Sequence, residues 1–98
     1  MIGQGGEAVP ADLQRLRDEI ERIDRELVRL IAQRVQLARA VGAAKRSAGM
    51  ATLDPAREAA VVRRAAALAR DAGIPDEDVR YIFWHLIGCA RRAQMEGE

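Results

Sequence analysis

Two positively charged residues stand at apolar positions of the sequence, where they could bind an anionic ligand. Between Leu13 and Ala44, the residues spaced alternately three and four apart are all apolar except Arg34. Lys45 follows Arg34 by eleven residues, which on an α-helix is about 20° in rotation and about three turns along the axis. The spacing therefore predicts two cations that point from one helix face into the same interior.

Further polar residues border the other apolar segments. Gln94 falls on the apolar face of a third expected helix, at i+4 from Ala90. Asp54, Arg57 and Glu58 stand around the start of a second expected helix, close to the loop that follows Lys45. The sequence thus places an amide, an arginine and two carboxylates near the segments that carry the cations.

Arg17 is placed differently. It precedes Arg34 by seventeen residues, roughly 25 Å along a helix axis and about 100° around it. On one straight helix the two side chains cannot contact one small molecule. If Arg17 shares the ligand, it must come from a partner chain.

The three cations also have purely structural interpretations. Arg34 could set the register of a helical dimer, or extend its head to water along its aliphatic stem. Lys45 could stabilise a helix C-terminus through the helix dipole. Arg17 could belong to the solvated i,i+4 charge pairs of its segment.

The uncharged and acidic candidates have such interpretations too. Asp54 is suited to cap a helix, Glu58 could pair with a nearby arginine, and Gln94 could face water at a fraying helix end. His85 has no partner at metal-ligand or catalytic-triad spacing, so we expect it at the surface. Cys89 is expected to be a small packing residue.

Composition favours an all-α cytoplasmic protein. The 98 residues, with only three aromatic side chains, predict one domain of packed helices. Sixteen basic residues, scattered among fifteen acidic ones, make nucleic acid or an acidic membrane surface an unexpected partner. A single cysteine excludes an internal disulfide and fits a reducing compartment. Neither a transmembrane segment nor a signal peptide is expected.

Helix signals divide the chain into a flexible leader, residues 1–10, and one helical domain, residues 11–98. Helices are expected at about 11–46, 55–72 and 76–95. Asp54 and Pro55 predict the start of the second helix, and Gly73 predicts its end. Gly42 costs the first helix about 1 kcal/mol relative to alanine, unless another segment must approach closely there.

The very long first helix predicts an intertwined homodimeric bundle. Some 35 residues form a rod of roughly 50 Å. A compact chain of this size has a radius of gyration of only about 13 Å. Because two shorter helices cannot cover such a rod, its apolar seam should pack against a second copy.

Taken together, these residues resemble a known enzyme family. The segments "LRDEIERIDRELVRLIAQRVQLARAVGAAK", "LDPARE" and "CARRAQ" are similar to the all-helical chorismate mutases of the AroQ type, from about Leu13 to Gln94. The resemblance implies a homodimer that rearranges chorismate to prephenate, on the way to phenylalanine and tyrosine. It implies no metal or other cofactor. Enzymes of this kind can also be switched by association with another enzyme of the pathway.

The resemblance also implies roles for the three cations and Gln94. Arg34 looks like the fork that binds a substrate carboxylate, and Arg17 of the other subunit looks like the second carboxylate clamp. Lys45 is similar to the cation that contacts a carboxylate and the ether oxygen. Gln94 matches the donor to that same oxygen, and as an amide it implies no acid limb from this position.

The resemblance implies roles for the other site residues in the same way. Asp54 and Glu58 match the residues around the ring hydroxyl, through backbone and carboxylate respectively. Arg57 matches another polar wall of the site. Ala90 departs from the family pattern, because it stands where a serine hydroxyl can face the substrate.

Three other functions remain open from sequence alone. The isochorismate-pyruvate lyases share the fold and a similar cationic pocket, although the complete "LDPARE" and Gln94 set favours the mutase. A non-catalytic helical dimerisation module would have no use for cations on apolar faces. A DNA-binding function is weaker still, because the basic residues form no continuous stripe.

Overall fold

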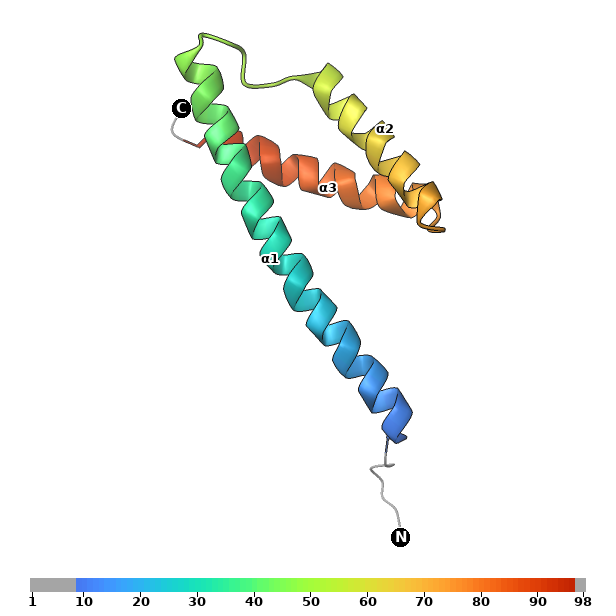
Figure 1. The fold of residues 1–98 in the computed structure, drawn as a ribbon. Coiled ribbons are helices and arrows are strands. Elements are labelled where there is room, and N and C mark those ends of the chain that lie inside the picture. Colours follow the sequence, from blue (N-terminus) through green and yellow to red (C-terminus); the bar gives the residue numbers. More distant parts are fainter. Residues whose placement is uncertain (1–8, 97–98) are drawn as a thin grey trace. The chain divides into compact units, whose positions relative to one another are not determined.

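The computed structural model of the chain describes residues 9–96 and contains three helices in that range (Figure 1). Helix α1 covers Ala11–Ser47, α2 covers Pro55–Asp71 and α3 covers Asp76–Gln94. The all-α class is therefore confirmed. Each expected helix begins at the residue where the structure begins it, and each C-terminus differs by one residue. The expected leader, residues 1–10, lies outside the described residues except for Val9 and Pro10.

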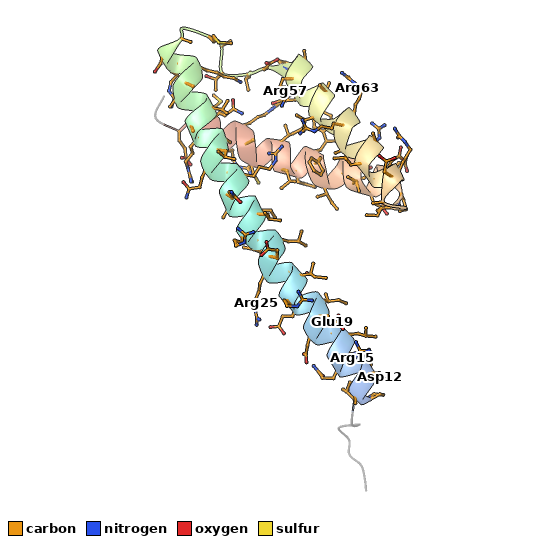
Figure 2. All side chains as sticks on the ribbon, viewed as in Figure 1. Asp12, Arg15, Glu19, Arg25, Arg57 and Arg63 are labelled. Carbon is orange, nitrogen blue, oxygen red and sulfur yellow. The ribbon has the colours of Figure 1, made fainter. Side chains whose placement is uncertain are left out.

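The structure divides into two compact units, Met1–Leu30 and Ile31–Glu98. In the described part of the first unit, the α1 side chains that follow the seam spacing are exposed, for example Ile20, which is 58% accessible. The polar faces carry short-range ion pairs, such as Arg15 with Glu19 at 2.7 Å (Figure 2). Exposed pairs of this kind contribute little stability. The apolar seam of this unit is thus left uncovered within the single chain.

The second unit contains an α2–α3 hairpin whose facing sides form its core. Val61, Val62 and Ile87 are buried together, and Phe83 packs against them half-buried. Small residues on α2 are also buried and let the helices approach closely. They are Ala65, Ala66 and Ala69.

The helix ends explain why α2 begins and stops where it does. The Asp54 side chain accepts a hydrogen bond from the Arg57 backbone N–H at 3.1 Å, which confirms the expected N-cap. At the other end Gly73 has φ +73°. The Ile74 N–H donates to the Ala69 carbonyl at 2.9 Å and the Gly73 N–H donates to the Arg70 carbonyl at 3.1 Å, the two bonds of a Schellman motif.

Gly42 is a point of close contact between α1 and α3. A Cβ atom there would stand 2.7 Å from the Cα of Gln94 and closer still to the Gln94 carbonyl oxygen. That oxygen accepts a hydrogen bond from the Arg46 guanidinium at 2.6 Å. The glycine therefore allows the end of α3 to lie against α1. Such a close approach is the exception to the helix-propensity cost that the sequence predicts for Gly42.

We expect Gly42→Ala to destabilise the fold by roughly 1–3 kcal/mol, because the added methyl group must displace backbone atoms of α3. Chemical denaturation should show the loss. The control is Gly88→Ala, whose Cβ would meet only the Arg92 side chain at 3.6 Å and which should be neutral or stabilising. Equal stability of the two variants would contradict the close contact.

Candidate active site

A cavity of about 500 Å³ lies in the second unit and is bordered by all three helices. Ligand pockets in proteins commonly have this size. Its apolar walls come from side chains such as Val41, Val61 and Ile87. Seven of the eight residues expected at the site line it, and the eighth is Arg17. The seven are Arg34, Lys45, Asp54, Arg57, Glu58, Ala90 and Gln94.

Lys45 is half-buried at the end of α1 and is held by two neutral acceptors. Its Nζ donates to the Thr52 carbonyl oxygen at 2.9 Å and to Gln94 Oε1 at 3.0 Å. An ammonium group has three N–H donors. One donor of Lys45 therefore has no partner among residues 9–96, and neither bond compensates its charge.

The contact with Lys45 also fixes the direction of the Gln94 amide. A lysine can only donate, so the amide oxygen must face Nζ. The amide NH2 group then points away from the ammonium and is available as a donor at the cavity wall. The site thus presents an ammonium and an amide N–H from two different helices.

Arg34 lies half-buried on the α1 wall of the cavity. Its Cζ stands 6.0 Å from the centroid of the Phe83 ring, at the outer limit of a cation–π contact. Within residues 9–96 it forms no ion pair. The guanidinium is therefore placed against apolar groups without a counter-ion.

Glu58 is the most strongly held carboxylate of the cavity. Its oxygens accept two hydrogen bonds from Arg91 of α3, at 2.8 and 2.5 Å, and its side chain is only 15% exposed. Hydrogen bonding to Arg91 lowers the pKa of Glu58 below the ordinary carboxyl value, and the charge of Lys45 lowers it further. Burial and Asp54 act in the opposite direction.

The other expected residues differ in their surroundings. Asp54 and Arg57 are exposed, with the Asp54 side chain engaged in the cap of α2. Figure 2 shows Arg57 near the start of that helix. Ala90 is half-buried and presents only a methyl group. Arg17 is exposed in the first unit and takes no part in the cavity lining.

Two arginines of the site were missed by the sequence interpretation. Arg64 lines the cavity, and its spacing of seven residues from Arg57 could have indicated the same helix face. Arg91 carries no comparable signal, because its partner Glu58 is 33 residues away. Only the packing of α2 against α3 brings that pair together.

Charge is unbalanced around the cavity. Arg34, Lys45, Arg57 and Arg64 line it without an ion pair within residues 9–96. Of the two carboxylates, Glu58 is already paired with Arg91 and Asp54 caps a helix. The arrangement is suited to a molecule with more than one negative charge.

Comparison with known proteins identifies the family. Residues 16–95 match the sequence profile described as "Chorismate mutase type II". The chain belongs to the type II chorismate mutases. The described residues contain no cluster of three metal-ligating side chains, and none of their helices is long and apolar enough to cross a bilayer.

Curated relatives of this chorismate mutase family member match part of its length. The "T-protein" of Haemophilus influenzae is 40% identical over 62 residues, which are 63% of this chain and 16% of that protein. The "Intracellular chorismate mutase" of Mycobacterium tuberculosis is 33% identical over 60 residues, 61% of this chain and 57% of that protein. The protein of the same name from Mycobacterium bovis has the same identity and coverage. The chain thus spans less than two thirds of these relatives.

Proposed function

We propose that the protein is an isomerase that rearranges chorismate to prephenate. The observation that carries the proposal is the cavity of about 500 Å³ with four cations that have no ion-pair partner among residues 9–96. Chorismate is a dianion, so its two negative charges can pair with these cations. Membership of the type II chorismate mutases supports the same reaction.

The first contribution of the protein is to hold the reacting ends of the substrate together. Arg34 binds one carboxylate through its planar guanidinium, and Arg17 of a partner subunit binds the other. Arg57 completes the positive wall. Fixing a flexible substrate in its reactive conformation lowers the entropic part of the barrier.

The second contribution is stabilisation of the charge that develops on the ether oxygen as the carbon–oxygen bond breaks. The free N–H donor of Lys45 and the amide NH2 of Gln94 provide two donors for that oxygen. Both are held in place before the substrate arrives. Because Gln94 is an uncharged amide, it adds no acid limb to the pH profile.

The remaining wall binds the ring hydroxyl of the substrate. The Glu58 carboxylate accepts its hydrogen bond, and the backbone at Asp54 provides a second contact. Ala90 supplies no hydroxyl, so affinity rests on the other groups. No covalent intermediate and no cofactor is part of the proposal.

We further propose a homodimer in which the exposed seam of α1 is covered by a second copy. Apolar side chains along α1, such as Leu16, Ile20 and Leu27, are about half exposed in the single chain. An intracellular location fits the printed name of the mycobacterial relatives. Association with another enzyme of the pathway is a further part of this proposal. Mass measurement in solution tests the dimer.

The reaction is tested by incubating the purified protein with chorismate and following the appearance of prephenate. A parallel assay with isochorismate detects salicylate and pyruvate. The proposal predicts prephenate from the first substrate at a rate far above the uncatalysed one. Turnover of isochorismate alone would identify a lyase, and no turnover of either would leave a dimerisation module.

A substitution of Arg64 tests whether the positive charge around the cavity attracts the substrate. We expect Arg64→Gln to raise KM for chorismate about three- to ten-fold with little change in kcat, because an exposed cation mainly attracts the substrate. The control is Arg63→Gln. It removes the same charge from the side of α2 that faces away from α3 (Figure 2), and it should leave KM nearly unchanged. Equal effects of the two variants would show that only net charge matters.

A further inference from the structure

Arg91 contacts the site indirectly, through a carboxylate. Its guanidinium bonds both oxygens of Glu58 in a bidentate pair, but Arg91 does not line the large cavity. It borders a second cavity of about 40 Å³, whose lining shares Lys45, Glu58 and Gln94 with the large one. Arg91 therefore contacts a residue of the large cavity without lining that cavity itself.

The bidentate contact between Arg91 and Glu58 restricts the orientation of the carboxylate. The two bonds are short, and they join α3 to α2 across the hairpin. The Glu58 side chain is 15% exposed, whereas that of Arg91 is 47% exposed. Water thus has little access to the carboxylate, and the guanidinium is the strongest donor that it meets.

We propose that Arg91 is a positioning residue that holds the Glu58 carboxylate in one orientation at the cavity wall. The inference rests on the proposed function, in which Glu58 accepts a hydrogen bond from the substrate. With two lone pairs committed to Arg91, the carboxylate offers its remaining lone pairs in a restricted direction. No other arginine or lysine of residues 9–96 bonds Glu58.

The charges around Glu58 predict how its titration responds. Lys45 of α1 and Arg91 of α3 both lower its pKa, whereas Asp54 at the cap of its own helix raises it. Arg57 of the same helix is a further cation at the cavity wall. Asp54 and burial both raise the pKa of Glu58, and Arg91 counteracts them. Removing the Arg91 charge therefore raises this pKa. The carboxylate then becomes protonated at a higher pH, and an activity that needs it ionised falls at a higher pH.

The test is a double-mutant cycle of kcat/KM for chorismate between about pH 4.5 and pH 8, with Arg91→Gln, Glu58→Gln and the double variant. We expect Arg91→Gln to lower kcat/KM about ten-fold, the scale of one charge-assisted hydrogen bond. Its acid limb should move to higher pH. Titration of the substrate carboxylates affects all variants equally, so a difference between their acid limbs comes from the enzyme. In the Glu58→Gln background, Arg91→Gln should have almost no further effect.

Two further variants separate positioning from simple loss of charge or structure. Arg91→Lys retains the charge but not the two-point geometry, so it should restore the acid limb and only part of kcat/KM. Arg92→Gln removes the neighbouring exposed charge, which contacts Cys89 Sγ rather than Glu58, and should behave like the wild type. An unmoved acid limb, or a full Arg91 effect in the Glu58→Gln background, would overturn the proposal.

A readout that does not need turnover keeps this proposal separate from the proposed function. Carbon-13 NMR of the Glu58 carboxyl group measures its titration directly in the wild type and in Arg91→Gln. A higher pKa of Glu58 in Arg91→Gln supports the interaction between the two side chains even if chorismate is not the substrate. An unchanged pKa contradicts it even if chorismate is turned over.

Discussion

Arg34→Leu is expected to lower kcat/KM for chorismate by roughly 100- to 1,000-fold. This corresponds to about 3–4 kcal/mol, within the range lost with one partner of a buried charge pair. The same change should leave the unliganded protein as stable as before or slightly more stable. Arg34 has no counter-ion among residues 9–96 and lines the cavity together with apolar residues such as Leu37, Ala38 and Val61. Replacing an unpaired, partly buried cation with an apolar side chain removes a desolvation cost.

Steady-state kinetics and thermal unfolding of the same Arg34→Leu preparation measure both effects. Arg34→Lys is the matched variant, since it retains the charge but loses the planar fork, and it should recover only part of the activity. A protein that melts at lower temperature, with unchanged activity per folded molecule, would show that Arg34 serves the fold instead.

Lys45→Met is expected to lower kcat by about 100- to 1,000-fold, the effect of losing one donor to developing negative charge. The structure adds a second reason, because Nζ also orients the Gln94 amide and bonds the Thr52 carbonyl. Without the ammonium group, the amide can rotate and its NH2 is no longer directed at the ether oxygen.

The matched control for Lys45→Met is Arg39→Gln, which removes another cation of α1. Arg39 pairs with Glu96 at 2.5 Å and does not line the cavity. Its replacement should leave kcat close to that of the wild type. If Lys45→Met instead raises KM while kcat is retained, Lys45 binds the substrate without stabilising the transition state.

Local signals predicted the helices well because each depends on neighbouring residues. Asp54 caps α2 and Gly73 ends it through a positive φ, as their positions indicated. The eleven-residue spacing likewise predicted that Arg34 and Lys45 share one helix face, and both line one cavity. Helix geometry alone sets that relation, so no knowledge of the packing was needed.

Contacts between helices were less accessible from the sequence. The pairing of Glu58 with Arg91 depends on how α2 lies against α3, and the two residues are 33 positions apart. The sequence left open that another segment approaches Gly42 closely, but it did not indicate the backbone of Gln94. The hydrogen bond between Lys45 and Gln94 likewise joins α1 to α3 and depends on how these helices pack. The homodimer and the contribution of Arg17 stay predictions, since they concern a second chain.

The most direct test of the central claim is calorimetric titration with a dicarboxylate analogue of the transition state. A cavity whose unpaired cations are built for a dianion should bind such a compound tightly in the wild type, with one molecule per cavity. Arg34→Leu should bind it at least about 100-fold more weakly, and the affinity of Arg63→Gln should be nearly unchanged. Equal affinity of the wild type and Arg34→Leu, or no binding to either, would contradict the account.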